Sequence, residues 1–139
     1  MKNKDYVTFE LSQLLKKNGF KEPCLSHYTA TGTVWRCNDE EDFNSESELK
    51  VYSRPTMWQV TKWLREVHGL HISISTVIGG RWTYELQDLW QKSNIDGEYN
   101  TRIPERDGYP CIDTYEAALH AGIESALELI NNNGNTILR

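Results

Sequence analysis

Residues 55–76, PTMWQVTKWLREVHGLHISIST, contain the clearest structural pattern in this chain of 139 residues. Thr56 followed three residues later by Gln59 is the pattern of a capping box, which starts a helix. Apolar residues then recur at helical spacing, and His68-Gly69 is typical of a helix end. From Leu70 onward apolar and polar residues alternate, as in a half-buried strand. The stretch therefore predicts a helix followed at once by a strand, onto which the rest of the chain can pack.

One tryptophan of this predicted helix does not fit its apolar stripe. The stripe comprises Met57, Val60, Trp63, Leu64 and Val67. Trp58 lies off it, so we expect Trp58 at the rim of the core or on a contact surface. It is the first candidate interaction residue.

A second strand is predicted over residues 81–88, after the glycine pair at 79–80. A two-residue turn at this pair would set the isoleucines of the first strand against charged residues, which a sheet with one buried face should reject. A loop of three or five residues restores the match, with Ile78 or Thr76 opposite Trp82. We favour the three-residue loop, which places Ile78 opposite Trp82.

The N-terminal part of the chain predicts another helix, over residues 5–19. Either Asp5 or Thr8 can cap its start. Gly19 ends it, and Phe20 is expected to fold back in a Schellman motif.

A β-hairpin is predicted over residues 24–37, and its register is left open by the sequence. The glycine at position 32 favours either a turn at residues 31–32 or a three-residue loop at residues 30–32 with Gly32 left-handed. Both registers offset Cys24 from Cys37. We therefore expect two separate core thiols rather than a disulfide.

The charge of the chain is concentrated in residues 38–48, which hold six acids and no base. Without them the formal net charge of −5 would become +1. We expect this stretch to be an acidic, mobile loop. The remainder shows no dense basic cluster of the kind that nucleic-acid binders use.

The last third of the chain is regular only from Asp113 onward. Residues 90–112 predict a long loop with one more short strand at residues 99–103 or 109–112, and with Cys111 packed inside. Asp113 and Glu116 form a capping pair for a final helix. Its smallest residues recur at four-residue spacing and predict a close approach to a neighbour; they are Ala118, Gly122 and Ala126. We expect the tail at 132–139 to fray.

The sequence offers no recognisable catalytic or metal-binding motif. His68 and His71 straddle a helix end rather than sharing a face, so we expect no zinc site, no cofactor and no enzyme activity. The N-terminus lacks the apolar core of a signal peptide, and no apolar run approaches the length of a membrane span. Three cysteines fit a reduced, cytoplasmic protein.

Three segments carry a resemblance: the pattern over residues 55–72, the Trp82-x-Tyr84 pair and the run at 113–118. Together they resemble a recurring group of small uncharacterised bacterial proteins associated with prophages and other mobile elements. The resemblance covers about half of the chain, over residues 55–86 and 113–130. It implies a cytoplasmic, accessory role and supplies no site residues.

The sequence therefore predicts a single α+β domain over residues 1–139, in two layers, with three helices packed on one face of a small antiparallel sheet. An alternative is an αβββα core from residue 56, similar in order to a double-stranded RNA-binding domain. The leading functional hypothesis is a non-enzymatic protein-interaction domain, with a protein partner or self-association as a dimer and with no membrane contact. The candidate interaction residues are Trp58, Arg81, Trp82, Tyr84 and Trp90.

The alternative hypothesis is a nucleic-acid-associated protein that stacks bases on aromatic side chains. It would use the region of Trp82, Tyr84 and Trp90. The basic residues available to it are Lys62, Arg65, Arg81, Lys92, Arg102 and Arg106. A contiguous basic patch on the folded surface would favour this alternative, and an exposed apolar patch would favour protein interaction.

Overall fold

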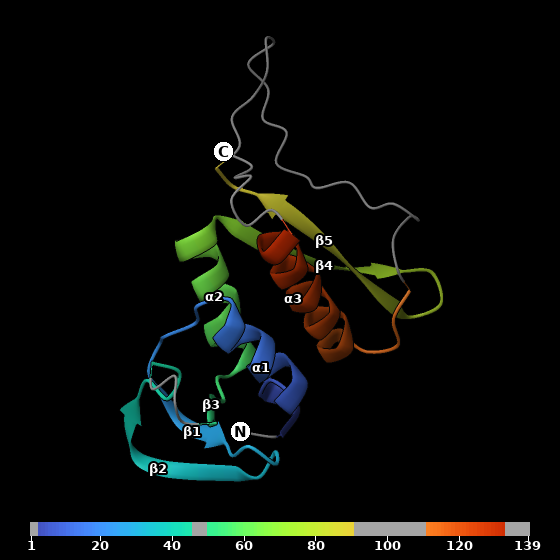
Figure 1. Ribbon diagram of the computed structural model, residues 1–139. Helices are drawn as coiled ribbons and strands as arrows, with labels where there is room; N and C mark the ends of the chain where they lie inside the picture. Colours follow the sequence, from blue (N-terminus) through green and yellow to red (C-terminus); the bar gives the residue numbers. More distant parts are fainter. Residues whose placement is uncertain (1–2, 46–49, 91–110, 133–139) are drawn as a thin grey trace. The chain divides into compact units, whose positions relative to one another are not determined.

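The computed structural model describes residues 3–45, 50–90 and 111–132 (Figure 1). Its elements follow in the order η1 (Asn3–Asp5, a 3-10 helix), α1 (Phe9–Lys17), β1 (Cys24–Tyr28), β2 (Val34–Glu41), β3 (Tyr52–Ser53), α2 (Met57–His68), β4 (Leu70–Val77), β5 (Arg81–Asp88) and α3 (Tyr115–Asn132). The described residues form two antiparallel sheets, of order β2-β1-β3 and β4-β5. The α+β class is confirmed, with two sheets in place of the single sheet expected.

The chain divides into two compact units, unit 1 (residues 1–63) and unit 2 (residues 64–139), and each is described by itself. The division falls within α2, between Trp63 and Leu64. The single domain expected from the sequence stays a prediction.

The first helix of unit 1 begins and ends by local hydrogen bonds that the sequence indicated. The side chain of Thr8, not Asp5, caps α1, and its hydroxyl accepts from the Leu11 amide at 3.2 Å. Gly19 adopts a left-handed φ of 89°, and the Phe20 amide donates back to the Leu15 carbonyl at 3.0 Å. The Schellman motif is thereby confirmed, and Phe20 is fully buried.

The hairpin of β1 and β2 has the three-residue loop at residues 30–32. The Thr29 amide donates to the Thr33 carbonyl at 2.8 Å, and Gly32 has a φ of 87°. Cys24 pairs with Glu41 rather than with Cys37, as the offset registers predicted.

The acidic stretch was wrongly expected to be a loop from residue 38. Strand β2 continues to Glu41, so the first acids of the stretch lie in a strand. Glu41 pairs with Cys24 of β1, and this pair keeps the acidic end of β2 in the sheet although residues 37–40 bulge. Residues 46–49 lie outside the described residues.

Helix α1 covers one face of this three-stranded sheet through aromatic contacts (Figure 1). The ring of Phe9 lies 5.5 Å from that of Tyr28 on β1 and 5.7 Å from that of Tyr52 on β3. The Tyr28 hydroxyl donates to the Val7 carbonyl at 2.6 Å. Phe20 and Trp63 meet edge to face at 5.2 Å. These contacts form the core of unit 1.

Helix α2 starts with the predicted capping box. The Gln59 amide donates to the Thr56 hydroxyl at 3.1 Å, and the Thr56 amide donates to the Gln59 side chain at 2.9 Å. Met57, Val60, Trp63 and Leu64 are buried as expected. Val67 was wrongly placed in the stripe and is 49% exposed, because the chain turns at Gly69 and Leu70 continues the buried set instead.

In unit 2 the pairing of β4 with β5 puts the isoleucines opposite aromatic and apolar residues, as the sequence required. The loop between the strands is not the favoured one. Thr76 lies opposite Trp82, which was the second alternative, and Val77 pairs with Arg81. The loop is residues 78–80, because both of its glycines adopt left-handed φ angles, of 91° and 73°. Ile78 therefore enters the loop and is fully exposed.

The cap of the final helix, α3, lies one residue later than predicted. The Ala117 amide donates to the Thr114 hydroxyl at 3.0 Å, so Thr114 rather than Asp113 caps the helix. Asp113 instead pairs with Arg81, which removes it from the capping role. Ile112 exchanges two main-chain bonds of 2.7 Å with Trp82 and forms a bridge, at the end of the short strand suggested for residues 109–112. Residues 109 and 110 lie outside the described part of the chain.

The described elements from α2 onward follow the order α2-β4-β5-α3, with an isolated bridge at Ile112 in the place of the third strand of the αβββα alternative. That alternative stays a prediction. The other suggested strand, at residues 99–103, and the tail at 133–139 lie outside the described part of the chain.

Helix α3 lies against the β4-β5 sheet at its small residues, as predicted. A Cβ atom placed on Gly122 would lie 2.7 Å from Ile72 Cγ2 and 3.4 Å from the Tyr84 ring. Ala118 and Ala126 are fully buried on the same helix face. The Tyr84 hydroxyl bonds the Ser125 hydroxyl at 2.6 Å and fixes the contact.

We predict that Gly122→Ala lowers the free energy of unfolding by about 1 kcal/mol, because the clash with Ile72 outweighs the gain in helix propensity. Urea denaturation followed by circular dichroism measures this change. Ala117→Gly, at an exposed position of the same helix, is the control for propensity alone and should also lose about 1 kcal/mol. A Gly122→Ala protein more stable than the parent would contradict the close packing.

Candidate interaction surface

The face of the unit 1 sheet opposite α1 carries large apolar side chains that the fold does not bury. Burial alternates along β1, with Cys24, Ser26 and Tyr28 inside. Leu25 and His27 therefore point to the other face, and Trp35 on β2 lies opposite His27. Leu25 is 52% exposed and Trp35 is 59% exposed. We call this the outer face.

Phe43 extends the outer face beyond the strands. Its ring centre lies 4.5 Å from that of His27, which is on this face. The Phe43 amide donates to the Ser53 hydroxyl at 3.2 Å. The turn after β2 is thereby fixed to β3, and Phe43 is held next to His27.

Buried polar contacts hold the return from β2 to β3. The Asn44 side chain donates to the Phe20 carbonyl at 2.8 Å and accepts from the Ser53 amide at 2.9 Å. Asp42 accepts from the Asn44 amide at 3.0 Å. Because Asn44 is itself buried, this crosslink fixes the position of the acidic end of β2 relative to the sheet.

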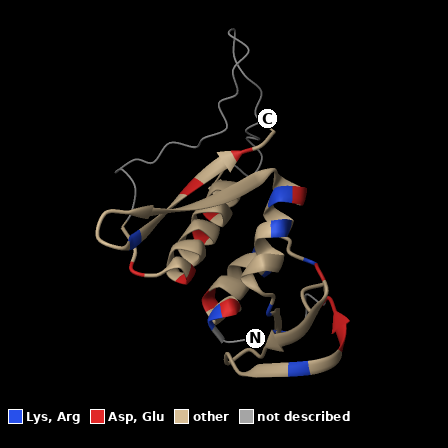
Figure 2. Ribbon diagram, turned by 180° about the vertical axis from the view of Figure 1, so that it is seen from behind, with Lys and Arg blue, Asp and Glu red and all other residues tan. Residues whose placement is uncertain are grey.

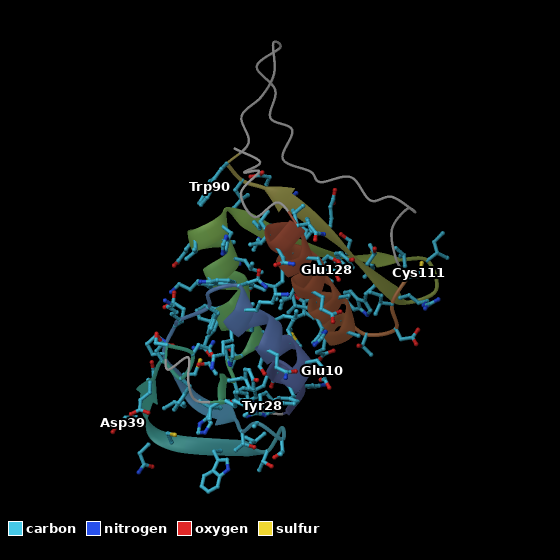
Figure 3. All side chains as sticks on the ribbon, in the orientation of Figure 1. Glu10, Tyr28, Asp39, Trp90, Cys111 and Glu128 are labelled. Atoms are coloured by element: carbon cyan, nitrogen blue, oxygen red, sulfur yellow. The ribbon has the colours of Figure 1, made fainter. Side chains whose placement is uncertain are left out.

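Acidic side chains gather at this end of β2. Asp39, Glu40 and Glu41 are exposed, and Asp42 is half-buried. Figure 2 shows the end of the strand as acidic, and Figure 3 labels Asp39 beside it. An apolar face and a negatively charged strand end therefore adjoin each other in unit 1.

The electrostatics of this region act on two further groups. Burial lowers the pKa of His27 below its ordinary value of 6.5, against an opposing effect of Glu41. The imidazole is therefore neutral near pH 7, which suits the apolar character of the outer face. Burial also raises the pKa of the Cys24 thiol to about 12, against a hydrogen bond with Ser53 that lowers it, and Glu40 and Asp42 add to the rise. Cys24 is consequently a poor nucleophile.

Trp58, singled out from the sequence, is 67% exposed on α2. The Lys62 ammonium lies 5.6 Å from the centre of its ring, at the distance of a cation–π contact. The structure thus places Trp58 at the surface, as its position off the stripe predicted.

The aromatic candidates of unit 2 are largely used by the fold. Tyr84 is 8% exposed and lies in the core. Trp82 is half-buried and meets Tyr115 edge to face at 5.4 Å. Trp90 is exposed on one side and lies against the backbone of Gly69 on the other (Figure 3). Little of the Tyr84 ring is accessible to a partner.

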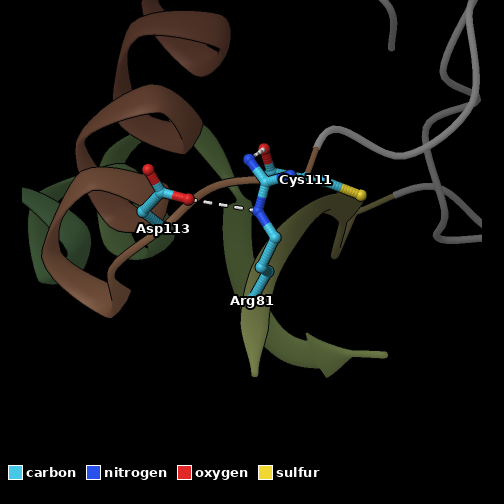
Figure 4. Close-up of polar contacts among 3 residues, drawn as sticks. All are labelled: Arg81, Cys111 and Asp113. Carbon is cyan, nitrogen blue, oxygen red and sulfur yellow. Dashed lines mark hydrogen bonds and ion pairs between the residues drawn. The ribbon is translucent and has the colours of Figure 1, made fainter. Parts of the chain in front are cut away.

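Arg81 joins the hairpin to the start of α3. Its Nε lies 3.1 Å from an Asp113 carboxylate oxygen, and its guanidinium donates to the Cys111 carbonyl at 2.8 Å (Figure 4). Both contacts hold the Ile112 bridge against β5. Cys111 was expected inside but is exposed, because it precedes the bridging residue Ile112, which is itself only half-buried.

The part of the chain that the structure describes contains neither a metal-ligand cluster nor a membrane-spanning helix. No group of three or more His, Cys, Asp and Glu side chains is placed to hold a metal ion there. No helix of those residues is long and apolar enough to cross a bilayer. Cys24, Cys37 and Cys111 are free thiols.

The outer face was missed by the sequence reasoning, although its signal was present. Residues 24–28 alternate Cys-Leu-Ser-His-Tyr, so one parity contains Leu25 and the other contains Tyr28. Both parities include an apolar residue, and only the aromatic packing of Phe9 decides which of them is buried. Trp35 could be assigned to the exposed side only after that choice.

The comparisons with known proteins add no relative. No protein-family model, no curated protein and no solved structure matches the chain.

We predict that the free energy of unfolding falls as the pH is lowered below about 6.5. His27 and His71 both have lowered pKa values, through burial and, for His71, the nearby Arg65 as well. The unfolded chain therefore binds protons in this range before the folded chain does, and stability rises with pH. Denaturant titrations at a series of pH values between about 5.5 and 7.5 measure the slope.

The variants His27→Gln and His71→Gln should each flatten this slope, because each removes one group that the fold keeps neutral. His120→Gln on α3 is the control for losing a histidine as such. An unchanged slope in the double variant of His27 and His71 would contradict the assignment.

Proposed function

We propose that this chain is a non-enzymatic protein-interaction module whose contact surface is the outer face of unit 1. The observation that carries the proposal is the exposure of Leu25 and Trp35 on a sheet face that no described element of unit 1 covers. Tryptophan is enriched among the residues that dominate binding energy at protein interfaces. An exposed apolar cluster with polar groups at its border is typical of such sites.

The outer face lies on the side of the sheet opposite the core of unit 1, which supports a role in binding. The opposite face of the same sheet packs against α1 through Tyr28, and Tyr28 is buried. Trp35 contributes a cross-strand pair with His27, a contact that stabilises a sheet by less than about 1 kcal/mol. The exposure of a large apolar side chain that adds so little to folding stability supports a role in binding a partner.

The proposed setting is an accessory protein of a prophage or other mobile element, acting in the cytoplasm. This setting rests on the resemblance of residues 55–86 and 113–130 to such proteins and on the reduced state expected for three cysteines.

The nucleic-acid alternative has less support. Arg81 is paired with Asp113, and Tyr84 is buried. The described surface of unit 2 has Arg65 and Arg81 as its only arginines or lysines, among more numerous acids (Figure 2). Those surface acids are Glu66, Glu85, Asp113, Glu116, Glu124 and Glu128, whereas Asp88 is buried. Lys92, Arg102 and Arg106 lie outside the described residues.

We predict that the double variant Leu25→Ser with Trp35→Ala loses its partner while keeping its fold. Affinity capture from the bacterial host, with the captured protein then purified and titrated by calorimetry, measures the loss. We expect the dissociation constant to rise at least about tenfold, because truncation of a central tryptophan costs about 2 kcal/mol or more at an interface.

Trp58→Ala is the matched comparison, since it removes an equally exposed tryptophan from another element of unit 1. Retained binding by Trp58→Ala together with loss in the double variant assigns the interface to the outer face. If the double variant binds as the parent does, the outer face is not the contact surface.

A further inference from the structure

The outermost strand of the unit 1 sheet has a free edge. Among the described residues, β2 pairs with β1 on one side and with no strand on the other. The Thr29 amide bonds the Thr33 carbonyl, so Thr33 turns its main-chain groups toward β1. These main-chain groups alternate along an antiparallel strand. The N–H and C=O groups of Trp35 therefore also point toward β1, and those of Val34 and Arg36 point away from it.

The other edge of β1 confirms this alternation. The Arg54 amide donates to the Ser26 carbonyl at 3.0 Å, so Ser26 directs its main-chain groups toward β3. Ser26 is the residue that lies opposite Arg36 on β2. Arg36 therefore belongs to a pair without main-chain bonds between its members, and its own N–H and C=O groups are available at the free edge.

Apolar side chains flank this edge on both faces of the sheet. Trp35 is 59% exposed on the outer face. Val34 is 41% exposed on the opposite face, which α1 covers over β1 and β3. A strand added alongside β2 would place alternate side chains against these two residues. Main-chain bonds would then supply affinity and the flanking side chains selectivity, as in other complexes formed by strand addition.

The charge of β2 decides what kind of strand fits. Asp39, Glu40, Glu41 and Asp42 follow the apolar segment, and Arg36 is the sole base of β2. We propose that the edge of β2 binds an extended, positively charged peptide segment, with an apolar side chain against Trp35 and lysine or arginine residues against the acids. This inference rests on the protein-interaction function proposed above and names the chemistry of the partner.

A second copy of the chain would fit the free edge of β2 less well than a basic peptide, because it offers no opposite charge to the acids. Antiparallel pairing of two β2 strands about Trp35 would place Val34 opposite Arg36, and the acids of each copy opposite the neutral loop around Thr31 of the other. The acidic ends would therefore gain no counter-charge. A basic partner satisfies both the main-chain groups and the charge.

The shape of β2 limits the edge to selective partners. Residues 37–40 of β2 form a bulge. Arg36 pairs with Ser26 and Glu41 pairs with Cys24, so four residues of β2 lie opposite the single residue Leu25 of β1. Bulges and charged side chains are the devices by which natural edge strands avoid indiscriminate pairing. The straight segment around Val34 and Arg36 is short, so we expect binding to depend on the acids as well as on the main chain.

The test uses the full chain and a labelled probe peptide, Lys-Arg-Thr-Ile-Thr-Val-Thr-Lys-Arg, which has basic ends for either strand direction. Fluorescence anisotropy measures its affinity. One comparison peptide has glutamate in place of every basic residue, and another has proline in place of isoleucine and valine. We expect the basic β-forming probe to bind at least about tenfold more tightly than either. Raising the salt from about 0.05 to about 0.5 M should weaken it several-fold.

Val34→Pro is the decisive variant, because it removes an N–H group from the free edge without removing a bond to β1. Val34→Thr is its matched control and retains the N–H. We expect about a tenfold loss for the proline variant and little change for the control. The variant Asp39→Lys with Glu40→Lys leaves the hairpin bonds in place and should lose the basic probe even if Val34→Pro fails to fold.

Three results would overturn the inference. One is equal affinity for the proline-containing probe, which would mean attraction by charge alone. Another is equal affinity for the acidic probe. The third is a dimer, seen by light scattering, that Val34→Pro dissociates, which would give the edge to a second copy. Each of these results leaves the capture experiment with Leu25 and Trp35 untouched, so the two proposals fail on different observations.

Discussion

The direction in which Tyr28 points determines the surface of unit 1. Its ring packs against Phe9 of α1, and its hydroxyl is bonded to the Val7 carbonyl. Since side chains alternate along a strand, this single placement puts Cys24 and Ser26 inside and Leu25 and His27 outside. The pairing of His27 with Trp35 then extends the same choice to β2. An exposed apolar face is the direct consequence of burying an aromatic one.

Sequence patterns were most informative where a structural signal is local. The capping box of Thr56 and Gln59 and the helix end at Gly19 each depend on hydrogen bonds that span a few residues, and both form as predicted. The close approach at Gly122 was also recognisable, because a small residue inside a helix that otherwise prefers larger ones needs a packing reason.

Prediction was weaker where competing partners decide the outcome. Asp113 and Thr114 are both good helix caps, and the ion pair of Asp113 with Arg81 leaves the role to Thr114. The parity of β4 and β5 followed from their apolar faces, but the loop position depended on which residues take left-handed φ angles, and Gly79 and Gly80 both do. The acids at residues 39–41 indicated a loop, but the pairing of Glu41 with Cys24 carries β2 across them, which is a tertiary effect.

The two units use their conspicuous residues differently, and this difference is the reason for proposing the contact surface in unit 1. In unit 2 the singled-out side chains have partners inside the unit: Tyr84 bonds Ser125, and Arg81 bonds both Asp113 and the Cys111 carbonyl. In unit 1 the apolar groups of the outer face lie beside unpaired main-chain groups and a concentrated charge. Exposed tryptophan, a free strand edge and a one-signed charge each have ordinary explanations separately. Their coincidence around Trp35 is what supports the proposal of a binding partner that is extended, partly apolar and basic.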